Sequence, residues 1–307
     1  MPRCGARPLR PELDLGLVVA GHGRHVIVET REGGRVRCHP RGKKSDAVVG
    51  DRVRWQRAGD EGVIEHVEPR ASLLFRRDEW KTKSFAANID QLLVLVAGVP
   101  TYSESQLARA LIAAEAAGVA ARIVLNKTDL PEAVLARERL APYRALPVDV
   151  IETSLKTQSA AARERLEPVL ERRATLLLGP SGSGKSTLVN LLVDGAAAQV
   201  GEVSRALGSG RHTTTVTQWY WLDLARTSAL IDSPGFQSFG LRQVDPARLA
   251  QLMPDLAARA AGCRYYNCRH QGEPDCAVRA AIDDGTISAS RYRIYLEILS
   301  ELSRPRW

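Results

Sequence analysis

A glycine-rich stretch, Gly179-Pro180-Ser181-Gly182-Ser183-Gly184-Lys185-Ser186-Thr187, matches the pattern G-x-x-x-x-G-K-[ST]. The apolar run before it, residues 174–178, suits a buried strand, and the largely apolar run after it, residues 188–193, can open a helix. A strand, a glycine-rich turn and a helix are the context of a phosphate-binding P-loop. We expect its backbone N–H groups to surround a phosphate chain, with Lys185 at the β- and γ-phosphates and the Ser186 hydroxyl on Mg²⁺. The stretch therefore predicts a nucleoside triphosphate site.

The composition is that of an ordinary globular chain with excess positive charge. Its 307 residues predict two or three domains. The net charge of +8 favours a polyanionic partner. Met1–Pro11 carries three arginines and three prolines, unlike the apolar core of a signal peptide, and the longest apolar run, Leu92–Val99, is far shorter than the roughly 20 residues that span a bilayer. We therefore expect a cytoplasmic monomer that does not bind membranes.

Residues 1–80 are predicted to form a small β-barrel of the OB or SH3 type. Five short runs alternate apolar and polar residues between Gly, Asp or basic turns. These runs are Leu13–Ala20, His25–Thr30, Arg35–His39, Val48–Trp55 and Gly62–Val67. Such barrels commonly bind nucleic acid, and the cluster Arg41, Lys43 and Lys44 is a candidate phosphate contact, a solvated basic loop being the alternative. We expect Cys38 to pack inside the barrel and Cys4 to lie in a loose terminus.

From Asn88 onward strands and helices alternate, which predicts a doubly wound α/β domain with a mostly parallel sheet. The expected strands are Asp90–Ala97, Arg122–Leu125, Val148–Glu152 and Thr175–Leu178, followed by a strand pair at Val216–Leu222 and Ser228–Asp232. The first expected helix of this part ends at Gly118, the second covers Glu132–Leu140 and the third covers Ala160–Leu170. The remainder is predicted to be helical, with helices at Pro246–Leu256 and Ser290–Leu302.

A second polar motif, Asn126-Lys127-Thr128-Asp129, follows a predicted buried strand. A carboxylate at Asp129 can accept hydrogen bonds from N1–H and the exocyclic amine of guanine, and adenine has neither donor at those positions. Asn126 can contact the other edge of the base, and the stem of Lys127 can pack over the ring. Such a motif alone can be an ordinary turn. Together with a P-loop, it predicts a guanine nucleotide.

A third motif, Asp232-Ser233-Pro234-Gly235, matches D-x-x-G at the end of a predicted strand. Asp232 would bind Mg²⁺ through its water shell, and the Gly235 N–H would contact the γ-phosphate. One threonine of Thr213–Thr215 would close on Mg²⁺; the sequence does not distinguish them, and we assign Thr214.

Phe236 occupies the position after this motif, where many GTPases have a glutamine that orients the attacking water. An apolar residue there predicts slow hydrolysis by the chain alone. We hypothesise that His212 takes this catalytic role, although a loop histidine is often only solvent-exposed. Unchanged partner-stimulated turnover in His212→Ala would count against the hypothesis.

Three cysteines and a histidine lie within 14 positions near the C-terminus: Cys263, Cys268, His270 and Cys276. Three thiolates and an imidazole suit a closed tetrahedral Zn²⁺ site with a structural role. The turn at residues 272–274 would let the chain fold back between His270 and Cys276. Buried thiols beside a surface histidine are the alternative. The set predicts one structural Zn²⁺.

The order of the motifs is unusual, because N-K-x-D ordinarily follows the P-loop and here precedes it. This order is a circular permutation, which a compact domain tolerates because its ends lie near each other. With the barrel, Asn88-Ile89-Asp90-Gln91, the residues G-R-H-T-T-T at 210–215 and the C-x₄-C-x-H-x₅-C set, the chain resembles the ribosome small-subunit-dependent GTPase A family over nearly its whole length. Ser183 stands where that family usually has valine and Ser233 where it usually has threonine; neither change removes a ligand.

The resemblance implies three domains: an RNA-binding OB-fold barrel at residues 1–80, a circularly permuted GTPase domain at 81–240 and a helical zinc-binding domain at 241–307. It also implies hydrolysis of GTP to GDP and phosphate, stimulated by the small ribosomal subunit in late assembly, with contacts to its rRNA.

Three other functions compete with this one. A transporter-type ATPase has a similar P-loop, but no L-S-G-G-Q signature occurs here, nor an apolar strand ending in Asp-Glu after the loop. A GTP-gated RNA-binding module with incidental hydrolysis would show no stimulation by a partner. A permuted GTPase acting on the large ribosomal subunit is disfavoured by the N-terminal barrel and the C-terminal cysteine set.

Overall fold

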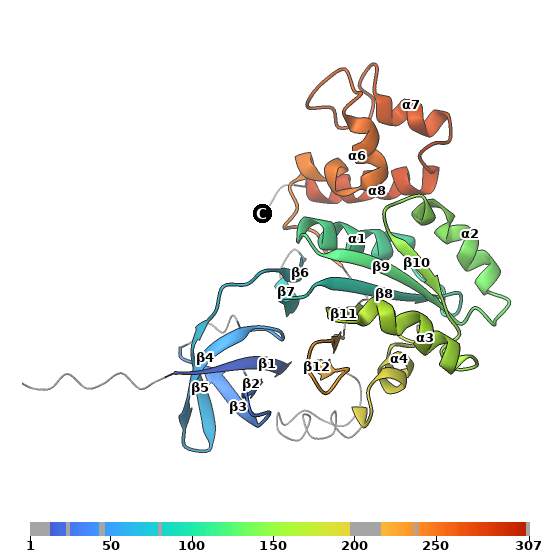
Figure 1. Ribbon diagram of the computed structural model, residues 1–307. Helices are drawn as coiled ribbons and strands as arrows, with labels where there is room; N and C mark the ends of the chain where they lie inside the picture. The colour runs from blue at the N-terminus through green and yellow to red at the C-terminus, as the bar shows by residue number, and fades with distance from the viewer. Residues whose placement is uncertain are drawn as a thin grey trace, which may run out of the picture.

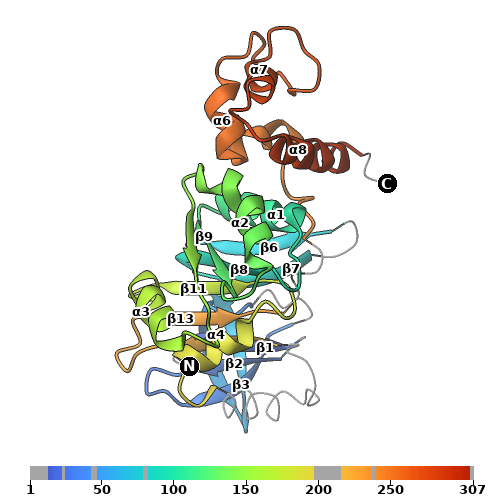
Figure 2. The ribbon, with the colours of Figure 1, turned by 90° about the vertical axis from the view of Figure 1, so that its right-hand side faces the viewer.

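The computed structural model describes residues 13–22, 25–42, 47–78, 82–196, 216–234, 236 and 239–304. The protein has three parts: a small β-barrel, a central α/β layer and a group of C-terminal helices (Figure 1). Figure 2 shows the central sheet between the barrel and the C-terminal helices. Within the described ranges, no helix combines the length and the apolar character needed to cross a membrane.

Five strands form the barrel: β1 Asp14–His22, β2 His25–Glu29, β3 Arg35–Pro40, β4 Arg52–Ala58 and β5 Glu61–Val67. They pair in the order β1-β2-β3-β5-β4, and β1 also pairs with β4, which closes the barrel. Along β4 the buried Val53 and Trp55 alternate with exposed residues. The predicted barrel is confirmed, and Cys38 packs in its core as expected. Cys4 lies outside the described residues.

The fourth strand begins at Arg52, so the prediction of a strand from Val48 was wrong. Residues 48–51 form a turn instead, because the Asp51 N–H donates to the Val48 carbonyl at 3.0 Å and the Val48 N–H donates to the Asp51 carboxylate at 2.8 Å. Asp51 is fully buried, and Arg70 donates to both of its oxygens, at 2.7 and 2.8 Å. Asp51 therefore ties this turn to the segment that leaves the barrel.

The central sheet has the order β10-β9-β8-β11-β13-β12. The strands are β8 Gln91–Ala97, β9 Ala120–Asn126, β10 Asp149–Glu152, β11 Ala174–Leu178, β12 Thr217–Trp221 and β13 Ala229–Asp232. All neighbours pair in parallel except β12, which is antiparallel to β13. Every residue of β8 is buried, which explains its continuous apolar run.

Four helices cover both faces of this sheet: α1 Glu104–Ala116, α2 Ala133–Arg144, α3 Ser159–Leu170 and α4 Lys185–Leu192. Alternate residues of β8 belong to two hydrophobic clusters, one shared with α1 and α2 and the other with α3 and α4. The predicted doubly wound α/β domain is confirmed. The Ser103 side chain accepts a hydrogen bond from the Gln106 N–H and so caps α1.

The barrel and the central sheet are continuous. Ala20 and Gly21 of β1 pair with Gln218 and Thr217 of β12, which makes one 11-stranded sheet. A separate antiparallel hairpin, β6 Leu73–Arg77 and β7 Thr82–Ala87, connects the barrel to β8 and was not predicted.

The C-terminal part is helical, as expected, but the single helix predicted at Pro246–Leu256 was wrong. Two short 3₁₀ turns, Pro246–Arg248 and Ala250–Leu252, precede α6 Pro254–Ala260. Pro254 causes the break, because its ring disfavours the helical conformation of Met253, which is extended at φ −118° and ψ 101°. Two further helices follow, α7 Ala277–Asp283 and α8 Ala289–Leu302.

Candidate functional site

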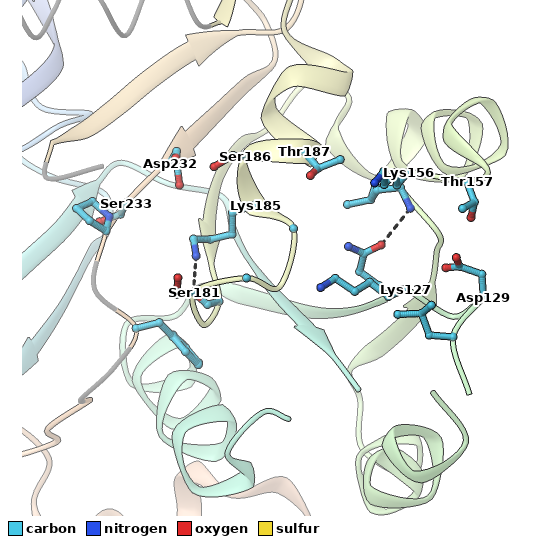
Figure 3. Close-up of a pocket in the computed structure, with 18 residues that line it drawn as sticks. Lys127, Asp129, Lys156, Thr157, Ser181, Lys185, Ser186, Thr187, Asp232 and Ser233 are labelled. Atoms are coloured by element: carbon cyan, nitrogen blue, oxygen red, sulfur yellow. Dashed lines mark hydrogen bonds between the residues drawn. The ribbon is translucent and has the colours of Figure 1, made fainter. Parts of the chain in front are cut away.

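The P-loop connects β11 to α4, as the sequence predicts. Gly184 precedes α4 with φ +112°, a conformation that favours glycine, and no side chain caps the N–H groups of the first turn. Free N–H groups at a helix N-terminus favour an anion. Lys185 lies beside them, and its Nζ donates to the carbonyl oxygens of Gly179 at 2.6 Å and Pro180 at 3.1 Å (Figure 3).

Two positions of the P-loop require glycine, because atoms of neighbouring strands leave no room for a Cβ there. A Cβ added at Gly184 would lie 2.3 Å from Nδ2 of Asn126, and one added at Gly179 would lie 2.2 Å from the carbonyl oxygen of Leu95. The P-loop is therefore packed directly against the ends of β8 and β9.

Asn126 joins three loops of the site through one side chain. Its Nδ2 donates to the carbonyl of Ser183 in the P-loop at 2.8 Å, and its Oδ1 accepts from the N–H of Leu155 at 3.0 Å. The side chain is only 3% exposed. Asn126 thus fixes the P-loop relative to both the N-K-T-D loop and the loop after β10.

The N-K-T-D loop rests on the Thr153-Ser154 pair that follows β10. The Thr128 hydroxyl donates to the Thr153 carbonyl at 3.1 Å, and the Ser154 hydroxyl accepts from the Asp129 N–H at 3.1 Å. Lys127, at φ +61°, donates from Nζ to the carbonyl of Val99 at 2.8 Å. These contacts leave the Asp129 carboxylate exposed. A hydrogen bond from its own backbone N–H lowers the pKa of Asp129, so the carboxylate is ionised at neutral pH.

A single cavity of about 980 Å³ contains residues of all three motifs. Figure 3 shows Lys185 and Asp232 on one side of it and Lys127 and Asp129 on the other. The predicted site residues that line it are Asn126, Lys127, Asp129, Gly179, Ser181, Gly182, Gly184, Lys185, Ser186, Thr187 and Asp232.

Three predicted site residues do not line the cavity. Thr128 anchors its loop, Pro180 presents its carbonyl to Lys185, and the side chain of Ser183 is fully buried within the P-loop. The assignments of His212, Thr214 and Gly235 lie outside the described residues.

Sequence reasoning missed part of the cavity wall. Leu155, Lys156 and Thr157 line the cavity from the loop after β10. The signal that could have found them is the polar Thr153-Ser154 pair, which directly follows β10. Phe236 also lines the cavity and is only 5% exposed.

Asp232 and Lys185 occupy the buried side of the cavity. Burial raises the pKa of the Asp232 carboxyl, and the charge of Lys185 opposes that shift. Burial likewise lowers the pKa of Lys185, opposed by Asp232. Oδ1 of Asp232 is buried and has no hydrogen-bond partner among the described residues. An unpartnered carboxylate oxygen in a cavity that Ser186 also lines suits Mg²⁺, which prefers oxygen ligands.

The predicted metal ligands also come together. The ligand atoms of Cys263, Cys268, His270 and Cys276 all lie within 4.8 Å of one another. Nδ1 of His270 is 3.5 Å from Sγ of Cys263 and 3.5 Å from Sγ of Cys276, and these two sulfurs are 3.9 Å apart. Tetrahedral Zn²⁺ with its usual bond lengths separates its ligand atoms by about 3.5–3.8 Å. The cluster is therefore compatible with a zinc site.

The cluster is held by α8 and by its own loop. The Tyr292 hydroxyl donates to the His270 carbonyl at 2.6 Å, and the Tyr295 hydroxyl donates to the Arg269 carbonyl at 2.9 Å. Burial lowers the pKa of His270, which favours the neutral ring that a metal ligand needs. Partial burial of Glu273 opposes its ionisation, but backbone N–H donors, chiefly those of Gly272 and Arg269, outweigh this and lower its pKa to about 2.

Comparison with known proteins agrees with this geometry. Residues 67–242 match the family described as RsgA GTPase. A protein of Variovorax paradoxus (strain S110) named Small ribosomal subunit biogenesis GTPase RsgA is 56% identical over 311 residues, covering 100% of this chain and 98% of that protein. The chain belongs to the RsgA GTPase family. A protein of the same name from Burkholderia pseudomallei (strain 668) is 51% identical, covering 94% of this chain and 92% of that protein.

Two solved structures have a similar fold. The crystal structure of YjeQ from Thermotoga maritima aligns with a TM-score of 0.73 at 29% identity, covering 95% of this chain and 100% of that one. The structure of YloQ, described as a circularly permuted GTPase, aligns with a TM-score of 0.69 at 24% identity, covering 99% of this chain and 100% of that one, and is evidence for the fold. Membership of a GTPase family sets aside the transporter-type ATPase.

The packing of Gly184 against Asn126 predicts a specific sensitivity of the site. Gly184→Ala should weaken guanine-nucleotide binding at least tenfold, because the new Cβ displaces the Asn126 amide and with it the P-loop. Gly195→Ala is the matched control, since Gly195 also has a positive φ, +70°, but no atom lies within 4 Å of the new Cβ. We expect this control to lose about 1–2 kcal/mol of stability and to keep its nucleotide affinity. Equal affinity losses in the two variants would contradict the packing argument. Titration with a fluorescent guanine nucleotide measures the affinity of each variant.

Proposed function

We propose that the cavity binds GTP with Mg²⁺ and hydrolyses GTP to GDP and phosphate. The observation that supports this most is convergence: three motifs distant in the sequence line one cavity of about 980 Å³. That volume is sufficient for a nucleotide.

Each part of the cavity has a proposed role. The exposed Asp129 carboxylate would accept the two guanine donors, and the N–H groups that begin α4 would bind the phosphates together with Lys185. Ser186 and Asp232 would hold Mg²⁺, which neutralises phosphate charge when bound. The roles of Thr214 on Mg²⁺, Gly235 on the γ-phosphate and His212 on the attacking water remain proposals from the sequence.

The relatives are named for small ribosomal subunit biogenesis. We propose that this subunit stimulates hydrolysis and that hydrolysis serves its late assembly. The barrel would contact rRNA, and the net charge of +8 supports a polyanionic partner. Arg41 is exposed on the barrel, although it also pairs with Glu65 at 2.8 Å. Lys43 and Lys44 lie outside the described residues. The chain would act as a monomer in the cytoplasm.

The proposed domains are an RNA-binding barrel at residues 1–80, a permuted GTPase domain at 81–240 and a zinc-binding domain at 241–307. We propose that the Cys/His cluster holds one structural Zn²⁺. The metal would fix the loop 263–276 against α8, where Tyr292 and Tyr295 already contact its backbone.

Hydrolysis measured with separated ribosomal subunits tests the proposed partner. The chain alone should hydrolyse GTP slowly, because Phe236 cannot orient a water molecule. Purified small subunits should raise the turnover of GTP at least tenfold. Purified large subunits should leave the turnover nearly unchanged. His212→Ala should lose most of the stimulated rate and keep the affinity for GTP. Stimulation by large subunits, or by neither, would contradict the proposal.

Zinc content tests the proposed metal. The purified chain should contain one zinc ion, and Cys276→Ser should lose it and unfold at lower temperature, since three ligands hold Zn²⁺ more weakly than four. Cys38→Ser is the matched control: Cys38 is buried in the barrel, so this variant should keep its zinc whatever happens to its stability. A wild-type chain without zinc, measured by atomic emission after purification free of chelators, would refute the assignment.

A further inference from the structure

A buried glutamine lies opposite the Asp232 carboxylate on the neighbouring strand. Strands β12 and β13 are antiparallel, and Gln218 is the direct partner of Asp232 in their register. Directly opposite residues of an antiparallel pair point to the same face of the sheet, with Cβ atoms about 4.5–5.5 Å apart. The two side chains are therefore neighbours, although Gln218 belongs to none of the predicted motifs.

The face that they share is the one that carries the P-loop helix. Two residues away along the same strands, Tyr220 and Leu230 belong to the hydrophobic cluster that residues of α4 also join. Side chains along a strand alternate between the two faces of the sheet, so Gln218 and Asp232 point to the side of α4 as well. The first residue of α4 is Lys185. Gln218 thus lies on the same side of the sheet as the phosphate-binding end of the cavity.

Each of the two opposed side chains has a buried polar atom without a partner. Gln218 is 4% exposed and Asp232 is 6% exposed. Nε2 of Gln218 is a donor and Oδ1 of Asp232 is an acceptor, and neither makes a hydrogen bond among the described residues. A buried polar atom without a partner costs free energy, and native structures keep few of them. An unsatisfied donor and an unsatisfied acceptor on one face, at directly opposite positions, are complementary.

The adjacent pair of residues shows that side chains at this end of the two strands can bond. Thr217 precedes Gln218 and Ser233 follows Asp232, and the hydroxyl oxygens of Thr217 and Ser233 are 3.0 Å apart. Both Asp232 and Ser233 line the nucleotide cavity (Figure 3). The beginning of β12 therefore flanks two successive residues of the D-S-P-G segment.

We propose that Gln218 is a positioning residue for Mg²⁺ binding, whose side-chain amide donates to the Asp232 carboxylate in the nucleotide-bound site, directly or through one water. A carboxylate has about four positions for hydrogen bonds, so Asp232 can accept from Gln218 and still hold Mg²⁺. The bond would fix the rotation of the carboxylate about its last torsion, which is otherwise broad. Because an amide is neutral, it would stabilise the ionised carboxylate without repelling the metal.

This inference rests on the proposed function, in which Asp232 holds Mg²⁺. A merely structural glutamine would change the affinity for nucleotide by the same factor at every magnesium concentration. A positioning residue for the metal would change only the part of the affinity that depends on magnesium.

The test compares Gln218→Met with Gln106→Met in titrations with a fluorescent, non-hydrolysable GTP analogue, across a magnesium series that starts from magnesium-free buffer. Gln218→Met keeps the length of the side chain and removes the donor. It should raise the Mg²⁺ concentration that gives half of the gain in affinity about tenfold, the value of one hydrogen bond to a charged group. Without Mg²⁺, its affinity should stay within about twofold of the wild type.

Gln106 provides the matched control. It lies on α1 and also has a buried side-chain atom without a partner, Oε1, but it does not line the nucleotide cavity. Gln106→Met should therefore match the wild type at every magnesium concentration.

A half-saturating Mg²⁺ concentration that does not rise in Gln218→Met, or an equal loss of affinity with and without Mg²⁺, would overturn the inference. If Gln218→Met does not fold, a crystal structure of the wild-type chain with Mg²⁺ and the GTP analogue decides. Nε2 of Gln218 within hydrogen-bond distance of Asp232, or of a water bound to it, would support the inference, and an unpartnered Nε2 would overturn it. A wild-type chain that binds no guanine nucleotide, or binds it equally well without Mg²⁺, would instead overturn the proposed function itself.

Discussion

The nucleotide site depends on the two hydrogen bonds of the Asn126 side chain. One bond holds the P-loop at Ser183 and the other holds the loop after β10 at Leu155, while the backbone of Asn126 itself begins the N-K-T-D loop. A buried amide with both bonds made is costly to disturb, because any displacement leaves polar groups unpaired. One residue therefore fixes the distance between the base-binding and phosphate-binding ends of the cavity. It does so although the N-K-T-D loop precedes the P-loop in this chain, the reverse of the usual order.

The permutation gives the site a direct connection to the C-terminal helices. The chain passes from β13 through Pro234 and Phe239 into those helices, without returning to the central sheet. Arg109 of α1 lies at this passage: it donates to the Phe239 carbonyl at 3.5 Å and to Glu297 and Glu301 of α8 at 3.2 and 2.6 Å. Arg109 thus connects Phe239, on the path from the nucleotide cavity to the C-terminal helices, with α8.

The sequence predicted whatever depends on local pattern or chemistry. The continuous apolar run of β8 predicts a buried strand. The glycines predict the P-loop, and the ligand types of the Cys/His cluster predict a metal site. It did not predict the hairpin β6–β7, whose short strands gain stability from Gly240 and Phe239, far away in the chain. The break at Pro254 was predictable from the sequence, because proline disfavours the helical conformation of the residue before it. The role of Asn126 in holding the loops together could not be predicted, because its partners are backbone groups, the Ser183 carbonyl and the Leu155 N–H, and nearly every residue has both.

The central claim is that this cavity selects guanine through Asp129, and base specificity tests it most directly. Asp129→Asn exchanges an acceptor for a donor, which suits xanthine, whose base has a carbonyl where guanine has its amine. The account predicts that this variant loses GTP affinity about a hundredfold or more and gains affinity for xanthosine triphosphate. Unchanged binding of GTP by Asp129→Asn, in a variant that folds like the wild type, would contradict it.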